Sequence, residues 1–190
     1  MCLHTYICSY IITIAGDRES NGGHKDGNAK TAQFNHPRGI CVGPDDSIYV
    51  ADFGNHCIRK ISGKTVSTIA GVPGEDGDLD GAANEALFSC PIDVDIDAQG
   101  NIYVVDGNGI RKIDVSGNVT TIVQRGENDT VDGTLEDGQL FGPQSLHIDG
   151  RGNILVADEV FLRYIDFSSN SISTITGHEE SDLSENNILL

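Results

Sequence analysis

The loop Asp76-Gly77-Asp78-Leu79-Asp80-Gly81 carries the residue types that bind a hard cation. Carboxylates at every second position can converge on one calcium ion, and glycine permits the turn between them. An EF-hand loop needs a bidentate glutamate at its twelfth position, which here is Leu87. The alternative is an ordinary turn at Asp80-Gly81. Asp76, Asp78 and Asp80 are therefore the candidate calcium ligands, and we otherwise expect neither a metal nor a cofactor.

Motifs for nucleophilic or metal-dependent hydrolysis are missing from the sequence. There is no Gly-x-Ser-x-Gly elbow, no His-Glu-x-x-His pair and no glycine-rich phosphate loop between a strand and a helix. The histidines are scattered along the chain rather than grouped. The sequence therefore predicts no catalytic residue and favours a protein that is not an enzyme.

The chain is strongly acidic. Its 190 residues include 29 acidic and 12 basic side chains, which give a formal net charge of -17. Binding of nucleic acid or of an anionic membrane surface needs a basic patch, so neither is an expected partner. No apolar run approaches the roughly 18 residues of a membrane-spanning helix. A protein or a basic peptide suits this charge, although acidity also serves solubility.

The cysteines favour a reducing compartment. Their number is odd, so they cannot all close into disulfides within the chain, and none forms a Cys-x-x-Cys pair. The stretch 1–14 lacks the basic segment and the cleavage site of a signal peptide. Both features favour a cytoplasmic location. The cysteines are Cys2, Cys8, Cys41, Cys57 and Cys90.

The chain repeats itself. The run Ile48-Tyr-Val-Ala-Asp52 returns as Ile102-Tyr-Val-Val-Asp106 and as Ile154-Leu-Val-Ala-Asp158, after 54 and then 52 residues. Self-similarity at one period indicates units that pack on their neighbours. Other elements recur with the same period: Pro37, Pro91 and Pro143; Asp26-Gly27, Asp80-Gly81 and Asp132-Gly133; and Ile58-Arg-Lys-Ile61, Ile110-Arg-Lys-Ile113 and Leu162-Arg-Tyr-Ile165.

Within one period, short apolar runs alternate with turn residues. The runs are of strand length, rich in Val, Ile and Tyr, and bounded by Gly, Pro, Asn or Asp. Four runs per period predict a four-stranded antiparallel blade of a β-propeller, because a small sheet exposes two apolar faces that need neighbours. Only 79–88 has the composition for one or two helical turns. In the first repeat the predicted strands are Gly39–Val42, Ile48–Ala51, Cys57–Ile61 and Val66–Ala70.

Three motifs carry a resemblance to a known family. They are Phe34-x-x-Pro-x-Gly, the run from Tyr49 to Ile61, and Thr-Ile-Ala-Gly at 68–71 ahead of Gly-x-x-Asp-Gly. The chain resembles the NHL-repeat family of β-propellers, in the variety found in teneurin-like and in plant or bacterial NHL domains. The resemblance covers residues 13–177. Departures are the shortened turn Gly107-Asn-Gly109, the third strand Leu162-Arg-Tyr-Ile165, and Thr121-Ile-Val-Gln-Arg125 in place of Thr-Ile-Ala-Gly.

The resemblance implies blades of a six-bladed ring. We therefore expect an all-β segment of three four-stranded antiparallel blades plus one extra N-terminal strand, about half of a six-bladed propeller. We expect this segment to belong to a longer chain and, on its own, to self-associate through the exposed faces of its terminal blades. Closure by two copies is disfavoured because the extra strand competes with Ser171–Thr176 for one outer position. The expected boundaries are 9–16 for the lone outer strand, 17–71, 72–124 and 125–177 for the blades, and 178–190 for an acidic tail that starts a missing blade.

Two kinds of connection meet on one face of a propeller: the turns between strands two and three, and the links between blades. Both kinds are acidic here, so we expect a protein or a basic peptide to bind this face. The expected partner-binding residues are Asp52, Asn55, Asp76, Asp78, Asp106, Asn108, Asp158 and Glu159. The links add the acidic residues Asp26, Asp80, Asp132 and Asp137.

The repeated aspartates have a second interpretation. Each precedes an arginine by five to seven positions across a hairpin turn, so that the two side chains can pair and brace the blade. The predicted ion pairs are Asp52–Arg59, Asp106–Arg111 and Asp158–Arg163.

The innermost strands bring residues of ligand type to equivalent positions near the channel. Some six-bladed propeller enzymes, such as the gluconolactonase-like and strictosidine-synthase-like families, hold a calcium ion on the channel axis. Alternatively, these side chains are core residues that form hydrogen bonds within the protein, because the residue type differs from blade to blade. The two sets are Cys41, Asp95 and His147, and Gly39, Asp93 and Ser145.

Two functions follow from these patterns. The first is a non-enzymatic NHL-repeat scaffold that binds a protein or peptide through its acidic loop face. The alternative is a fragment of a six-bladed propeller lyase or calcium-dependent hydrolase of the gluconolactonase-like or strictosidine-synthase-like kind. An enzyme needs convergent carboxylates and histidines on the axis, whereas a binding module needs only exposed loops.

Overall fold

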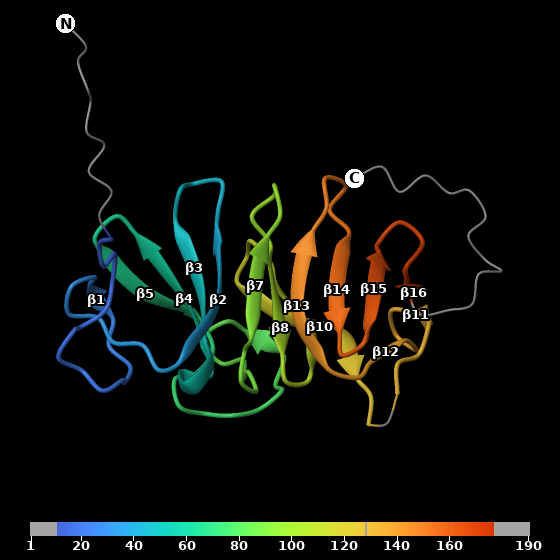
Figure 1. The fold of residues 1–190 in the computed structure, drawn as a ribbon, viewed down its shortest axis with the longest axis horizontal. Coiled ribbons are helices and arrows are strands. Elements are labelled where there is room, and N and C mark those ends of the chain that lie inside the picture. The colour runs from blue at the N-terminus through green and yellow to red at the C-terminus, as the bar shows by residue number, and fades with distance from the viewer. Residues whose placement is uncertain (1–10, 128, 177–190) are drawn as a thin grey trace, which may run out of the picture.

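Three antiparallel sheets follow one another along the chain (Figure 1). The computed structural model describes residues 11–127 and 129–176. Within these residues the protein is all-β, with one short 3-10 helix, η1 (Phe53–Asn55), and no helix of the length and hydropathy that crossing a membrane requires. Each sheet is a blade of a β-propeller, as the repeat predicts.

The first blade is a meander in the order β1-β5-β4-β3-β2. Its main strands match the four predicted apolar runs, and η1 occupies the turn between the second and the third of them. The strands are β1 (Gly27–Asn28), β2 (Pro37–Val42), β3 (Ile48–Asp52), β4 (Cys57–Ser62) and β5 (Thr65–Ala70).

The second and third blades repeat this plan, in which a two-residue strand pairs with the outer strand, and the second blade has two such strands, β6 and β12. The second blade has β6 (Gly81–Ala82), β7 (Asp93–Ile96), β8 (Ile102–Asp106), β9 (Gly109–Ile113), β10 (Asn118–Arg125) and β12 (Gln139–Leu140). The third blade has β11 (Gly133–Thr134), β13 (Pro143–Ile148), β14 (Ile154–Asp158), β15 (Phe161–Asp166) and β16 (Ser171–Thr176).

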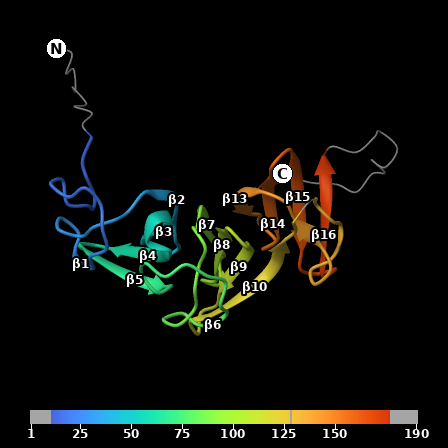
Figure 2. The ribbon, with the colours of Figure 1, turned by 90° about the horizontal axis from the view of Figure 1, so that it is seen from below.

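The blades stand side by side around an arc (Figure 2). The inner strands β2, β7 and β13 line its concave side, with β7 in contact with both of the others, while β5, β10 and β16 lie on the outer side. The turns after β3, β8 and β14 and the links between blades lie on the same side of the arc, the lower side in Figure 1, which we call the loop face.

Two apolar cores fill the spaces between blades. Strand β8 shows why, because its alternate side chains point to opposite faces of the sheet. Ile102 and Val104 pack in the core shared with the first blade, whereas Tyr103 and Val105 pack in the core shared with the third. The middle blade is therefore buried on both faces, which explains its nearly continuous apolar strand.

Two local expectations are wrong within the described residues. Residues 11–16, the described part of the lone outer strand expected at 9–16, form no strand, because the described residues offer them no inner strands to pair with. Residues 79–88 contain β6 and a turn in place of a helical turn, because β6 pairs with β10. Residues 9, 10 and the tail expected at 178–190 lie outside the described residues.

On the outer faces of the first and third blades, apolar side chains are exposed whose equivalents at the junctions between blades are buried. Ile40 on β2 is 65% exposed, whereas its equivalents Val94 and Leu146 are 2% and 8% exposed. Leu162 on β15 is 46% exposed, whereas its equivalent Ile110 is fully buried against the next blade. The two open faces thus have the composition of the two sides of a blade interface.

We expect the chain to self-associate through these faces, and Leu162→Glu to reduce that association. A charge on the open face of the third blade cannot be buried without a large desolvation cost. Light scattering over a concentration series measures the effect, with Val115→Glu, a change in the exposed β9–β10 turn, as the control. A monomer at all concentrations would contradict the expectation.

Candidate functional site

A buried arginine occupies the centre of each blade. Arg59, Arg111 and Arg163 lie on the third main strand, and their side chains are fully buried. In each blade, Nη1 donates to the aspartate at the end of the neighbouring strand. The Nη1 to Oδ2 distances are 2.6 Å for Asp52, 3.3 Å for Asp106 and 3.3 Å for Asp158. The three pairs that the hairpin spacing predicts are therefore present.

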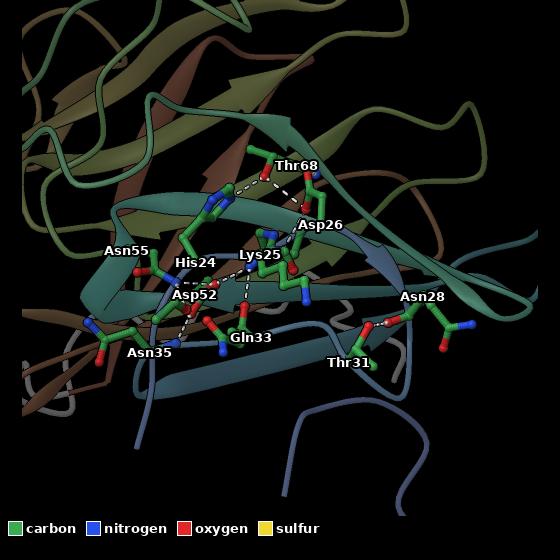
Figure 3. Close-up of polar contacts among 12 residues, drawn as sticks. His24, Lys25, Asp26, Asn28, Thr31, Gln33, Asn35, Asp52, Asn55 and Thr68 are labelled. Carbon is green, nitrogen blue, oxygen red and sulfur yellow. Dashed lines mark hydrogen bonds and ion pairs between the residues drawn. The ribbon is translucent and has the colours of Figure 1, made fainter. Parts of the chain in front are cut away.

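Each guanidinium also holds the segment that enters its blade. In the first blade, Nη1 donates to Gln33 O and Nη2 donates to Lys25 O and, at 2.6 Å, to Asp26 Oδ1. The carboxylate of Asp26 in turn accepts from Thr68 N and Thr68 Oγ1 on β5, as Figure 3 shows. The other blades repeat these contacts with Asp80 and Thr121, and with Asp132 and Thr174.

Each arginine thus binds a second carboxylate, that of Asp26, Asp80 or Asp132. The sequence patterns did not predict these pairs and instead placed the three aspartates on the acidic loop face. They lie beside the outer strands, about half exposed and paired with arginine. The signal was present, since these aspartates share the period of the arginines. The pairs could not be inferred from a hairpin turn, because 31 to 33 residues separate each aspartate from its arginine.

Four of the expected partner-binding residues are buried and therefore inaccessible to a partner. Asp52, Asp106 and Asp158 are fully buried, and Asn55 is 6% exposed and donates to Gly23 O and to Asp52 Oδ2. A partner cannot reach these side chains in the folded blade, so their placement on an accessible face is wrong. The ion pairs explain it, because a carboxylate that neutralises a buried guanidinium must itself be buried.

The rest of the expected set lies on the loop face. Asp76, Asp78 and Glu159 are exposed, and Asn108 is half-buried. Asp76 Oδ1 lies 3.7 Å from His56 Nδ1, while Asp78 and Glu159 form no ion pair with any described residue. These side chains remain available to a partner.

On the channel side of the arc, the expected metal-ligand residues Asp93 and Asp95 form hydrogen bonds with the neighbouring blade instead. Asp93 Oδ2 accepts from Leu146 N at 3.1 Å, and Asp95 Oδ2 accepts from Ile148 N at 2.9 Å. His147 Nδ1 lies 3.2 Å from the same oxygen of Asp95. These carboxylates therefore join the inner strands β7 and β13 across the blade junction.

The described residues do not fit a bound metal ion. Within them no three side chains of His, Cys, Asp or Glu converge in a way that could hold one. Of the candidate calcium loop, Asp80 is bound to Arg111 and to Thr121. The side chains of Asp76 and Asp78 alone supply too few ligands for calcium.

The thiols of Cys41 and Cys57 are poor nucleophiles. Burial, followed by the charges of Asp95 and Asp93, raises the pKa of Cys41 to about 12. Burial also raises the pKa of Cys57 to about 12. Because the thiolate is the reactive form, both cysteines stay inert at neutral pH.

Burial raises the pKa of Asp106 to about 6, against the opposing effects of backbone hydrogen bonds from Ser89 and Gly107 and of Arg111. Arg111 Nη1 donates to Asp106 Oδ2 at 3.3 Å, a longer contact than the 2.6 Å between Arg59 Nη1 and Asp52 Oδ2.

Two family models match the chain. The model described as "NHL repeat" matches residues 34–61, and the one described as "Teneurin NHL domain" matches residues 71–134.

Individual proteins show the same likeness. The chain is 42% identical over 78 residues to NHL repeat-containing protein 2 of Bos taurus, a match that covers 39% of this chain and 11% of that protein. It is 29% identical over 145 residues to a probable peptidyl-alpha-hydroxyglycine alpha-amidating lyase of Caenorhabditis elegans, covering 72% of this chain and 38% of the lyase. The matches thus span between a tenth and two fifths of these relatives.

A solved structure extends the likeness to the fold. A structural genomics protein of Bacteroides thetaiotaomicron superimposes with a TM-score of 0.61 and 25% identity, over 75% of this chain and 36% of that one. The three-blade arrangement therefore has a counterpart in a longer protein.

Replacing a central arginine should destabilise the protein strongly. Arg163→Met leaves Asp158 buried without its counter-charge and releases Asp132, and we expect a loss of about 3–5 kcal/mol in the free energy of unfolding. Chemical denaturation measures it. The exposed Arg151 provides the control, since Arg151→Met should change stability by less than about 0.5 kcal/mol. A similar small change for Arg163→Met would contradict the role of the arginine.

The stability of the protein should depend on the ionisation of Asp106. Its folded pKa of about 6 lies above the reference value of 3.8, so the folded state binds this proton more tightly than the unfolded state does. Between these two pH values the free energy of unfolding should therefore fall as pH rises, by on the order of 2 kcal/mol relative to Asp106→Asn. Denaturation of both proteins over this range tests the sign, and a relative gain with rising pH would refute it.

Proposed function

Because the chain belongs to the NHL-repeat family of β-propellers, we propose that it is a non-enzymatic scaffold that binds a basic protein or peptide on its loop face. The blades supply rigidity, since both faces of the middle sheet are packed and each blade is braced by its arginine. Function then falls to the connections on the loop face, where exposed side chains vary without cost to the core.

One observation carries this proposal. Glu75, Asp76 and Asp78 are exposed within a few residues of one another in the link between β5 and β6, and no described lysine or arginine forms an ion pair with any of them. Glu159 adds a further exposed carboxylate on the same face. Carboxylates that gather without a paired lysine or arginine make the local electrostatic potential more negative, which attracts a cationic partner.

A second candidate is a lyase or calcium-dependent hydrolase, of which this chain would form one part. The similarity to the Caenorhabditis elegans lyase over 145 residues supports it. The described channel side weighs against it, because Asp93 and Asp95 already accept backbone hydrogen bonds from β13. Calcium binding detected by calorimetry would favour this candidate over the scaffold.

Binding of a capped oligolysine peptide tests the scaffold. We expect binding at low salt that weakens as salt is added, and a loss on the order of tenfold in affinity when Glu75→Gln, Asp76→Asn and Asp78→Asn are combined. Fluorescence anisotropy of the labelled peptide measures both effects.

The matched control removes three carboxylates on the opposite side of the arc (Figure 1), in the β2–β3 turn, in the β9–β10 turn and at the end of β15, through Asp46→Asn, Asp114→Asn and Asp166→Asn. This variant has the same net charge as the first. Equal losses in the two variants would show that only net charge matters and would overturn the loop face as the binding surface.

A further inference from the structure

Each junction between blades joins two unlike faces, because the side chains of a strand point alternately to the two sides of its sheet. At the junction of the second and third blades, β8 supplies Tyr103 and Val105 from one sheet, and β14 supplies Ile154 and Val156 from the other. A blade therefore meets the blade after it with one face and the blade before it with the other.

Two faces have no blade against them within residues 11–127 and 129–176 (Figure 2). We call the free face of the third blade, which carries Leu162, the leading face, and the free face of the first blade, which carries Ile40 and Val42, the trailing face. Leu162 lies where the second blade has Ile110, and Ile40 lies where the third blade has Leu146. Ile110 and Leu146 belong to one buried core. The two free faces thus carry the two halves of a junction.

The inner strands supply polar ties at the same junction. Asp93 Oδ2 of β7 accepts from Leu146 N of β13 at 3.1 Å. In the third blade the place of Asp93 is taken by the exposed Ser145, whose hydroxyl can accept a hydrogen bond. A first blade offers it the amide of Ile40, the counterpart of Leu146. A second tie repeats this pattern farther along the strands, with Asp95 and Ile148 at the existing junction and His147 and Val42 on the free faces.

The number of copies follows from the blade count. Contact between unlike faces of identical chains either closes into a ring or continues without end. Propellers close with about four to eight blades, and about six is the only multiple of three in that range. With three blades in each chain, two copies therefore close a ring.

One segment must move for this ring to close. Gly16 N donates to Ala29 O as Gly71 N donates to Ala83 O, so residues 11–15 lie where a preceding blade would have its outer strand. They form no strand, and residues 11–14 are exposed. Strand β16 of a second copy can therefore displace them with little loss of buried surface. The competition expected from the sequence does not prevent closure.

We propose that two copies of this chain bind head to tail, with the leading face of each third blade against the trailing face of the other copy's first blade. The contact repeats the junction of the second and third blades, with Leu162 and Ile40 in its core and Ser145 and His147 as acceptors. The loop face lies to one side of this contact, so the proposal does not depend on the proposed function.

Mixing two variants tests the contact between unlike faces. Ile40→Lys and Leu162→Glu should each raise the dissociation constant of the pair at least about tenfold, because each puts a charge into an apolar junction. An equimolar mixture should recover association, since a mixed pair keeps one native junction and joins opposite charges in the other. Light scattering after size exclusion measures the mass, and Val115→Glu, in the exposed β9–β10 turn, is the control.

Three outcomes would overturn the proposal. Loss of association in only one of the two variants indicates contact between like faces. Particles of more than two chains show that the contact does not close. A monomer at all concentrations leaves the free faces to other blades of a longer chain.

A second measurement uses the unchanged chain. As the protein concentration rises, the amides of Ile40 and Val42 should exchange with deuterium more slowly, because the second copy covers them. The amide of Gly63 in the β4–β5 turn should keep its rate. Association without protection at Ile40 and Val42 would place the contact elsewhere and refute the head-to-tail pair.

Discussion

A buried guanidinium holds each blade together. Removing an arginine from water is costly, and the cost is offset only when its donors and its charge are matched. Here Nη1 and Nη2 of each arginine meet two carboxylates and two backbone carbonyls, drawn from the neighbouring strand and from the segment that enters the blade, while Nε has no partner among the described residues. The incoming segment contributes only a two-residue strand to the sheet, and the arginine adds further polar ties beside those made by Asp52, Asn55 and Thr68.

Apolar packing then joins one blade to the next. Because strand side chains alternate, each sheet offers one apolar face to the blade before it and one to the blade after it. The middle blade uses both faces, whereas the outer two leave residues such as Ile40 and Leu162 exposed. Asp93 and Asp95 add polar ties between inner strands at one of the two junctions.

Differences among the blades are as informative as their repetition. The three arginine networks share their outer carboxylates and threonines, but the inner aspartates differ in the donors that they receive. Burial raises the pKa of Asp106 to about 6, even though the amides of Ser89 and Gly107 and the charge of Arg111 favour its ionised form.

The sequence by itself determined the architecture. The spacing of Ile48-Tyr-Val-Ala-Asp52 and its two copies, together with strand-length apolar runs, predicted three four-stranded blades, because periodicity and turn chemistry are local properties of the chain. The pairing of Asp52 with Arg59 was also predictable from the sequence, because a hairpin places the two residues on adjacent strands.

Only the tertiary structure decided which acidic residues are exposed. Asp52 and Asp76 are alike in the sequence, yet one is buried against a guanidinium and the other faces solvent. The partnership of Asp26 with Arg59, and the hydrogen bond from Cys90 N to His56 Nδ1, depend on segments brought together from more than 30 residues away. No local pattern encodes such contacts, because they arise from how the folded blades pack.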